Sequence, residues 1–266
     1  MWTRLEGNGP PVVFLHGWLM DHGDEFASYD AVFAARGYRR IYFDLPGMGR
    51  STDLPLPHDL DGYADQVAAA IRDEIGDQPF LLSGTSAGAL IACGVAARMP
   101  ESLRGLLLRV PMIHGDDQRR RVDPVPVLHE DADLIASLAR RDRIILGAAP
   151  IIQRPAWIKA LLAKMETRVL PAMRRARGRD LGPLRGDPAR YDMRQVQTQF
   201  QHPALILVAR QDDNVGWRDA VDRSADWPRA TLAVLDAAGH EFPLDHQMPL
   251  AHALIEDWLD RVELAP

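Results

Sequence analysis

A serine in a glycine-flanked turn is the strongest chemical signal in this sequence of 266 residues. Ser86 lies in the Gly-Thr-Ser-Ala-Gly turn of residues 84–88, after the apolar run 80–82 and before the helix-like run 89–93. A strand, a Gly-x-Ser-x-Gly turn and a helix form the context in which a serine is exposed as a nucleophile. The turn must be tight, so glycines are needed where a Cβ would collide with neighbouring backbone. The motif alone is weak, because glycine and serine are common loop residues.

An acid and a base follow this serine along the chain. Asp212 lies three residues beyond the predicted strand 204–209, and His240 ends the loop after the predicted strand 231–235. A serine hydroxyl is a poor nucleophile at neutral pH, so Ser86 needs a base that takes its proton, and histidine titrates near pH 7. Asp212 would hold the imidazole in the right tautomer and stabilise its charged form. The three residues therefore predict a Ser-His-Asp triad.

Neighbouring residues are alternatives for the acid and the base. Asp213 is adjacent to Asp212, and Asp236 lies at the end of a predicted strand. His246 and His252 lie on the approach to the last predicted helix, where we expect surface or packing histidines. The residue types alone leave these choices open.

The sequence resembles the α/β-hydrolase fold family, in its form with a cap domain, and five motifs carry the resemblance. They are the His16-Gly17-Trp18 loop after 12–15, the loop 44–51 after 41–43, the turn 84–88, the Asp212 loop and Gly239-His240. These motifs span the chain apart from roughly residues 111–200. The resemblance implies a doubly wound sheet and the chain order serine, acid, base. It also favours Asp212 as the acid, because the spacing of Ala209, Asp212 and Val215 fits the family.

The resemblance further implies an oxyanion hole. The backbone N–H groups of Trp18 and Ala87 would bind the carbonyl oxygen of a substrate as it becomes negative. His16 is expected to be structural, bracing this loop through ring hydrogen bonds. The Trp18 indole would line the pocket, with simple packing as the alternative. We assign no chemistry to the loop 44–51, whose glycines serve backbone geometry.

Short apolar runs alternate with helical stretches over most of the chain. This pattern favours an α/β fold with a mostly parallel, doubly wound sheet that is buried on both faces. The predicted strands are 12–15, 41–44, 80–83, 106–110, 204–209 and 231–235. Helices are predicted at 61–76, with Gly76 as its cap, and at 249–262, while residues 2–6 leave room for one edge strand. The predicted hydrolase core comprises residues 1–110 and 201–266.

The alternation stops over residues 111–200, where we expect a helical cap (lid) insertion. Helices are predicted near 131–141, 156–177 and 188–200, and Pro171 should kink or divide the second of them. The insertion holds 17 Lys and Arg against 11 Asp and Glu, whereas the remainder of the chain holds 14 against 26. A basic cap over an acidic core should be held in place partly by electrostatics.

Two arginine-rich stretches occur in the insertion. The first comprises Arg168, Arg174, Arg175, Arg177 and Arg179, and the second is the run 119–121. We interpret both as solvated surface, because they lack interleaved aromatic residues and the chain carries a net charge of −6. They predict no nucleic-acid partner.

Apolar residues of the insertion are candidates for the substrate pocket, with core packing as an equal alternative for each. These candidates are Met112, Ile113, Trp157, Leu161 and Met165, together with Trp18 and Trp217 of the core. Specificity is expected to depend on such wall residues, which a sequence alone does not identify.

Composition sets limits on the class of protein. Hydrophobic residues make up 47% and charged residues 26%, as in ordinary globular proteins, and one cysteine, Cys93, excludes an intrachain disulfide framework. Neither metal-ligand spacings nor phosphate or dinucleotide loops are present in the sequence, so we expect no metal and no cofactor. A core strand begins by Val12, which leaves no room for a signal peptide, and no apolar run approaches the roughly 20 residues of a membrane span. We expect a cytoplasmic protein without a membrane partner; a homo-oligomer is left open.

The first functional hypothesis is hydrolysis of a small carboxylic ester or lactone through an acyl-enzyme. Capped members of the family also hydrolyse carbon–carbon bonds of diketone-like substrates with the same triad, and this is the first alternative. Amide or imino-peptide cleavage and a non-catalytic ligand receptor are further alternatives. Ser86 argues against the dehalogenases and epoxide hydrolases of this fold, which carry aspartate at the elbow.

Overall fold

A seven-stranded sheet forms the centre of the protein. The computed structural model describes residues 1–147 and 149–264. The strands are β1 (Thr3–Glu6), β2 (Pro11–Leu15), β3 (Arg39–Phe43), β4 (Phe80–Thr85), β5 (Leu103–Arg109), β6 (Ala204–Ala209) and β7 (Ala230–Leu235). Their order across the sheet is β1-β3-β2-β4-β5-β6-β7, and all neighbours are parallel except β1, which runs antiparallel to β3. All six predicted strands are present, and β1 is the expected edge strand.

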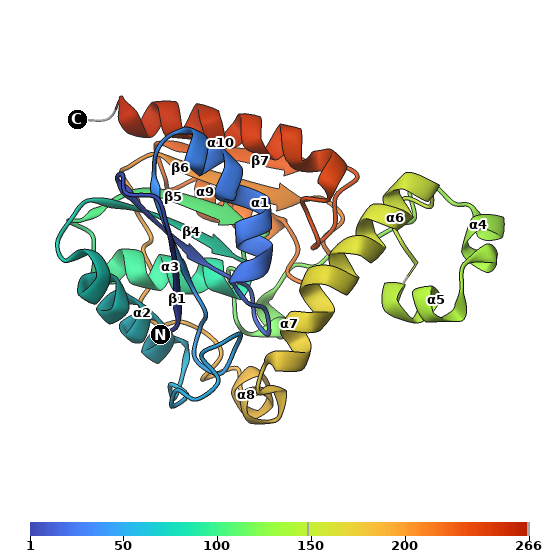
Figure 1. Ribbon diagram of the computed structural model, residues 1–266, viewed down its shortest axis with the longest axis horizontal. Helices are drawn as coiled ribbons and strands as arrows, with labels where there is room; N and C mark the ends of the chain where they lie inside the picture. Colours follow the sequence, from blue (N-terminus) through green and yellow to red (C-terminus); the bar gives the residue numbers. More distant parts are fainter. Residues whose placement is uncertain (148, 265–266) are drawn as a thin grey trace.

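Helices cover both faces of this sheet. They are α1 (His22–Ala35), α2 (Leu60–Ile75), α3 (Ala87–Arg98), α9 (Arg218–Ser224) and α10 (Met248–Glu263). Figure 1 shows α1 and α10 on one side of the sheet and α2 and α3 on the other. In β2, Val13 and Leu15 pack with α2 and α3, whereas Val12 and Phe14 pack with α1 and α10. A strand covered on both faces is apolar at every position, so the predicted fold class is confirmed.

Local signals set the ends of α2. The Asp59 carboxylate accepts the Gly62 N–H at 2.9 Å and caps the first turn. Gly76 ends the helix with φ 62°, a conformation that favours glycine. The predicted helix 61–76 therefore agrees with the observed one to within a residue at each end.

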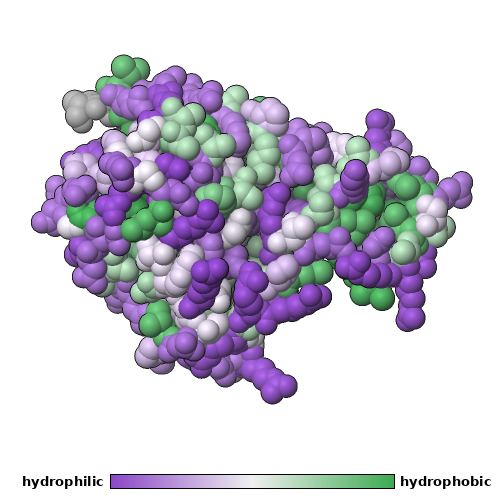
Figure 2. All heavy atoms as spheres, in the orientation of Figure 1, coloured by the Kyte–Doolittle hydropathy of each residue, from purple (hydrophilic) through white to green (hydrophobic). Residues whose placement is uncertain are grey.

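Residues 111–200 leave the sheet after β5 and return to it at β6. They contain the short 3-10 helix η1 (Asp117–Arg119), α4 (Ala132–Ser137), α5 (Arg140–Leu146), α6 (Pro155–Lys164), the π-helical turn η2 (Met165–Val169), α7 (Leu170–Arg175) and α8 (Gly178–Arg185). In Figure 1, α6 and α7 form one slanting helix beside the sheet, and α4 and α5 project away from it. Figure 2 shows apolar surface on this projecting part, where Ile144 and Leu128 are exposed.

Two of the three helices predicted in the insertion differ from the observed ones in form. The stretch 131–141 gives two short helices, α4 and α5, because the chain is extended at Leu138 and Ala139. The slanting helix continues through Pro171 without dividing. A proline ring crowds the carbonyl four residues earlier, and that carbonyl lies in the π-helical turn, where the Leu170 N–H bonds to the Met165 carbonyl. A change of hydrogen-bond register thus accommodates the proline.

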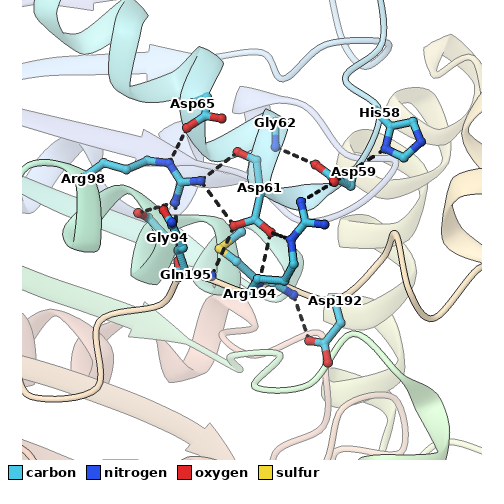
Figure 3. Close-up of polar contacts among 11 residues, drawn as sticks. His58, Asp59, Asp61, Gly62, Asp65, Gly94, Arg98, Asp192, Arg194 and Gln195 are labelled. Carbon is cyan, nitrogen blue, oxygen red and sulfur yellow. Dashed lines mark hydrogen bonds and ion pairs between the residues drawn. The ribbon is translucent and has the colours of Figure 1, made fainter.

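The helix predicted over residues 188–200 is wrong, since this fully described segment contains none. Its backbone bonds to the core instead: the N–H groups of Arg194 and Gln195 donate to the Asp61 carboxylate at 3.1 and 3.2 Å. Figure 3 shows that the Asp61 carboxylate also accepts a hydrogen bond from the guanidinium group of Arg98 in α3, with an N···O distance of 3.2 Å. Partners outside the segment therefore satisfy backbone groups that a helix would pair internally. The sequence analysis also missed α8.

Arginines of the insertion pair with carboxylates. The interpretation as solvated surface is wrong for Arg120 and Arg168, whose side chains are largely buried. It agrees with the exposed side chains of Arg119, Arg121, Arg174, Arg175 and Arg179. Arg168 lies 3.2 Å from Asp245 and 3.5 Å from Asp24, and Arg175 pairs with Asp21. The run 119–121 pairs at 2.5 to 2.8 Å: Arg119 with Asp192, Arg120 with Asp117 and Arg121 with Asp219. Arg121, Arg168 and Arg175 thus link the basic insertion to the acidic core, whereas Arg119 and Arg120 pair within the insertion.

The structure also describes the single cysteine and the apolar character of the helices. Cys93 is buried in α3, and burial raises the pKa of its thiol to about 11. Among the helices that the structure describes, none combines the length and the apolar character needed to cross a lipid bilayer.

Replacement of Gly84 by alanine should destabilise the protein. A Cβ at this position would lie 2.5 Å from the Gly88 carbonyl oxygen and 2.7 Å from the Ala89 Cα, which are backbone atoms that cannot rotate away. We expect the free energy of unfolding to fall by about 1 to 3 kcal/mol. Gly182→Ala is the matched control, because a Cβ there meets no atom within 4 Å and Gly182 lies inside α8. Urea unfolding compares the two, and equal stability of Gly84→Ala and the wild type would contradict this account.

Candidate active site

Ser86 lies on a tight turn between β4 and α3. Its φ of 55° and ψ of −121° fall outside the usual regions for a residue with a side chain. The Ser86 N–H donates to the Arg109 carbonyl at 3.0 Å, and the Met112 N–H donates to the Ser86 carbonyl at 3.1 Å. A Cβ on Gly88 would lie 2.4 Å from the His16 carbonyl oxygen, so glycine is required there. The turn thus holds the Ser86 hydroxyl at the N-terminus of α3.

The structure brings Ser86, His240 and Asp212 together. The Oγ of Ser86 lies 3.1 Å from Nε2 of His240, and Nδ1 of the same ring lies 2.8 Å from Oδ2 of Asp212. The other Asp212 oxygen accepts the N–H groups of Asn214 and Val215, both at 2.9 Å. These bonds fix the orientation of the carboxylate, which in turn orients the imidazole.

The alternative residues lie elsewhere. Asp213 is exposed, and Asp236 accepts the Gln211 side-chain amide at 2.9 Å. The His246 ring packs 4.0 Å from the Trp157 ring, between centroids, and His252 bonds to the Ser28 carbonyl. The geometry therefore favours Asp212 and His240 over their neighbours.

The carboxylate of Asp212 controls the charge of the His240 ring. Burial of this ring disfavours its protonated form, but the attraction of the Asp212 carboxylate and its hydrogen bond outweigh the burial. The pKa of His240 is therefore raised above its usual value near 6.5. The ring can accept a proton readily and hold it.

Two backbone N–H groups near Ser86 are without an acceptor in the described part of the chain. Neither Trp18 N–H nor Ala87 N–H has a hydrogen-bond acceptor among the described residues. His16 holds the Trp18 loop in place: its Nε2 accepts the Leu45 N–H at 2.9 Å, and its Nδ1 donates to the Gly17 carbonyl at 2.8 Å. The ring is neutral because its Nε2 accepts a hydrogen bond, and burial lowers the pKa of His16. The expected bracing role of His16 is confirmed.

Strained backbone gathers at the same edge of the sheet. Within the described ranges, the non-glycine residues with positive φ are Leu19, Ser86, Val110 and Ala237. Each follows the carboxyl end of a strand, namely β2, β4, β5 and β7. Such conformations are costly, most of all for a β-branched residue such as Val110 with φ 38°. Strain of this kind is concentrated at functional sites in proteins.

Comparison with known proteins agrees with this geometry. A sequence model described as the alpha/beta hydrolase family matches residues 12–253. The chain belongs to the alpha/beta hydrolase family. The expected resemblance is thereby confirmed, as is the expectation of an enzyme of this family.

Two curated relatives and one solved structure illustrate the relationship. The chain is 29% identical to a pimeloyl-[acyl-carrier protein] methyl ester esterase of Chromobacterium violaceum, with 96% of this chain and 97% of that protein covered. It is 28% identical to a protein of the same name from Xanthomonas campestris pv. campestris, with 93% and 94% covered. An alpha/beta superfamily hydrolase from Oenococcus oeni PSU-1 shares the fold with a TM-score of 0.84, at 23% identity, covering 98% of this chain and 96% of that one.

Two cavities of this hydrolase meet at His240. One, of about 270 Å³, contains Ser86 and is here called the serine cavity. The other, of about 360 Å³, has mostly apolar walls and is called the apolar cavity. His240, Glu241 and Phe242 line both of them.

The predicted pocket residues divide between these cavities. Trp18 and Met112 line the serine cavity, whereas Trp157, Leu161 and Met165 line the apolar cavity. Ile113 and Trp217 line neither: Ile113 packs against the core, and the Trp217 ring carries the guanidinium groups of Arg210 and Arg218.

Four buried charged residues of the serine cavity were missed by the sequence analysis. They are Asp24, Glu25, Arg109 and Lys164, here called the buried charge cluster. Burial favours the neutral form of both carboxyl groups, yet the charges of Lys164 and Arg109 hold the pKa of Asp24 well below its usual range, whereas burial raises the pKa of Glu25. One signal was available, because Arg109 follows the apolar run Leu106–Leu108 within the predicted strand 106–110.

No group of three or more His, Cys, Asp or Glu side chains suited to a metal ion occurs in the part of the chain that the structure describes.

Removal of the Asp212 charge should lower the pKa of His240. In Asp212→Asn the attraction that opposes burial is lost, so we expect the ring to become neutral at a lower pH than in the wild type. Asp213→Asn is the matched control, because Asp213 is exposed and contributes least among the groups that raise this pKa. Titration of the ring protons by NMR gives the pKa of His240 in all three proteins. A larger decrease in Asp213→Asn than in Asp212→Asn would show that the acid is misassigned.

Proposed function

We propose that this protein hydrolyses a small carboxylic ester or lactone, with Ser86, His240 and Asp212 as its catalytic triad. The observation that supports the proposal most is the unbroken chain from Ser86 Oγ through the His240 ring to the Asp212 carboxylate, with distances of 3.1 and 2.8 Å. A base within hydrogen-bond reach of a nucleophile, itself oriented by an acid, is the arrangement that acyl transfer requires.

In the proposed reaction, His240 removes the proton of Ser86 as the hydroxyl oxygen attacks the ester carbonyl carbon. The carbonyl oxygen becomes negative and accepts hydrogen bonds from the Trp18 and Ala87 N–H groups, whose free donors support this role. In another serine hydrolase, one such donor lowers the barrier by about 3 to 4 kcal/mol. His240 then gives its proton to the departing alkoxide, which leaves as an alcohol.

The second half of the reaction repeats these steps with water. His240 takes a proton from a water molecule that attacks the acyl-enzyme, and returns it to Ser86 as the carboxylic acid departs. The raised pKa of His240 suits both directions of transfer. Because the neutral ring is the base, activity should be present above this pKa and lost as the pH falls through it.

The names of the relatives support an ester as the substrate. Two related proteins that align over nearly their whole length are named methyl ester esterases. A bond between an acyl group and a small alcohol also suits cavities of 270 and 360 Å³, which have room for a small molecule. A small-molecule ester or lactone is therefore the proposed partner of the site.

We further propose that residues 111–200 act as a cap that shapes the substrate pocket. Lys164 and Val169 line the serine cavity, while Trp157 and Met165 line the apolar cavity, so the slanting helix contributes to both. The projecting part contributes Leu146 to the apolar cavity. Residues far from the triad in the sequence would thus select the substrate.

Ser86→Ala should abolish covalent labelling by a fluorophosphonate and lower ester turnover by up to about 10⁶-fold, because the nucleophile is gone. Ser137→Ala is the matched control, since Ser137 is exposed on α4 and should leave both unchanged. Labelling is followed by mass spectrometry, and turnover with 4-nitrophenyl acetate. Undiminished labelling of Ser86→Ala, mapped to another serine, would refute the proposed function.

Leu146→Ala should weaken the preference for longer acyl chains. Leu146 lines the apolar cavity, and removing its side chain takes away apolar contact equivalent to one or two CH₂ groups, or about 10-fold in kcat/KM. Ile144→Ala is the matched control on the same helix, because Ile144 is 68% exposed and does not line this cavity. The ratio of kcat/KM for 4-nitrophenyl hexanoate to that for the acetate is the measurement. An unchanged ratio in Leu146→Ala would argue against the cap proposal.

A further inference from the structure

We propose that the serine cavity contains a binding site for a carboxylate of the substrate, formed by the guanidinium groups of Arg120 and Arg185. These two residues are here called the arginine pair. The inference rests on the proposed ester hydrolysis at Ser86 and specifies its substrate class: an ester that also carries a free carboxylate, a few carbons from the reacting carbonyl.

The arginine pair lies where the serine cavity meets a further pocket, here called the outer pocket. The outer pocket, of about 450 Å³, is lined by Asp117, Arg120, Val122, Arg185, Asp213 and Asn214. Arg120, Arg185 and Asn214 also line the serine cavity. A substrate bound at Ser86 can therefore reach the arginine pair without leaving the serine cavity.

Arg120 is buried close to the nucleophile. Only 4% of its side chain is exposed. Its Nη2 lies 3.0 Å from Sδ of Met112, and the Met112 N–H donates to the Ser86 carbonyl at 3.1 Å. The carbonyl groups of His114 and Gly115 accept from Nε and Nη2 of Arg120 at 2.7 and 2.9 Å. These bonds hold the positive charge of Arg120 in a fixed position.

The charge of Arg120 is incompletely balanced. Among the described residues, one carboxylate lies within ion-pair distance of it, that of Asp117 at 2.8 Å. Burial disfavours the charge of Arg120, Asp117 favours it and Arg185 repels it, and the balance lowers the pKa of Arg120. Arg109, the other buried arginine of the serine cavity, has a raised pKa, because two carboxylates of the buried charge cluster outweigh its burial. A further anion would therefore stabilise Arg120, whereas Arg109 already has its partners.

Arg185 supplies free hydrogen-bond donors. Its Nη2 donates to both Asp117 oxygens, at 2.8 and 3.0 Å, whereas its Nε and Nη1 have no acceptor among the described residues. The guanidinium group lies over the Tyr191 ring, 4.7 Å from the ring centroid, and this ring packs edge-on against the Trp18 indole at 4.9 Å. Both aromatic rings line the serine cavity. The planar donors of a guanidinium group match the two oxygens of a carboxylate, so Arg185 can bind a second one.

Asp117 shows how the arginine pair binds a carboxylate. One of its oxygens lies 2.8 Å from Nη1 of Arg120 and 2.8 Å from Nη2 of Arg185, so the two guanidinium groups converge on one acceptor. The Asp117 side chain is 60% exposed and lies on the three-residue helix η1, where water can replace its partners. Exposed ion pairs contribute little to stability, so a substrate carboxylate can compete with Asp117.

The charges around the arginine pair select an anionic ligand. Asp213 and Glu241 also line these cavities, but neither forms an ion pair with Arg120 or Arg185. The buried charge cluster is balanced internally by two carboxyl groups and two cations. Two guanidinium groups and Asp117 together carry one positive charge. A substrate ammonium group would be repelled there, whereas a carboxylate would neutralise the site.

The test compares esters in which a methyl ketone replaces the carboxylate at nearly the same size. On the acyl side the pairs are monomethyl succinate with methyl 4-oxopentanoate, monomethyl glutarate with methyl 5-oxohexanoate, and monomethyl adipate with methyl 6-oxoheptanoate. On the alcohol side the pair is carboxymethyl butanoate with 2-oxopropyl butanoate. In at least one pair we expect the wild type to hydrolyse the carboxylate about 10- to 100-fold more efficiently, because hydrogen bonds between charged groups are the stronger ones. The release of acid at constant pH gives kcat/KM for each ester.

Two variants assign the preference to the proposed residues. Arg185→Gln should bring the ratio in the preferred pair close to one. Arg179→Gln is the matched control and should keep the wild-type ratio, because Arg179 is exposed on the same helix α8 and lines neither cavity. Asp117→Asn should raise the ratio by up to about 5-fold, because it removes the competing carboxylate. Circular dichroism reports whether each variant is folded, and the wild-type ratio tests the inference even if one variant does not fold.

The outcomes separate this inference from the proposed function. A wild-type ratio of one or less in every pair would overturn the carboxylate site, while leaving ester hydrolysis in place. A preference that persists in Arg185→Gln would overturn the assignment to the arginine pair, and a lower ratio in Asp117→Asn would overturn the competing role of Asp117. Absence of turnover with all eight esters, together with an unlabelled Ser86, would overturn the proposed function and the inference with it.

Discussion

One buried cation, Arg109, connects the nucleophile turn to the cavity beside it. Its carbonyl accepts the Ser86 N–H, and its guanidinium donates to Thr85, Asp24 and Glu25. A buried guanidinium is tolerated only with such partners, and removal of one member of a buried ion pair typically costs 3 to 5 kcal/mol because the other charge is left uncompensated. The same residue therefore fixes the backbone of the turn and the carboxylates of the cavity wall. Neither can shift without the other.

The attachment of the insertion depends on the same group of charges. The ion pair of Lys164 with Asp24 is buried, whereas the pairs of Arg168 with Asp245 and of Arg121 with Asp219 each have one exposed partner. Exposed pairs contribute at most about 1 kcal/mol each, so the arginine-rich surface matters less than its number of ion pairs suggests. Buried packing at Val169, Ala172 and Leu181 adds the apolar part of the contact. The slanting helix is thus held where it also forms the cavity wall.

The sequence predicted those features of the fold and the site that depend on local residue patterns, and it missed those that depend on contacts between distant segments. The strands were predictable because a parallel strand is buried on both faces and shows as a continuous apolar run. Ser86, Asp212 and His240 were predicted to lie together because each follows such a strand, and parallel strands place their carboxyl ends at one edge of the sheet. The helix predicted over 188–200 failed because Asp61 and other core groups bind its backbone. The buried charge cluster joins α1, β5 and α6, and only the fold brings these segments together.

The two cavities differ in polarity, and His240 lies where they meet. In the proposed reaction the proton moves between Ser86 and the leaving group, so the base has to stand beside the bond that breaks. A substrate with a polar part and an apolar part would place the first in the serine cavity, where charged side chains such as Lys164 lie, and the second against Leu161 and Trp157. The reverse orientation would bury a polar group of the substrate against apolar walls without a partner, which costs about 1 to 3 kcal/mol, or 5- to 150-fold in binding. The polarity of the walls would therefore orient the ester bond before any chemistry begins.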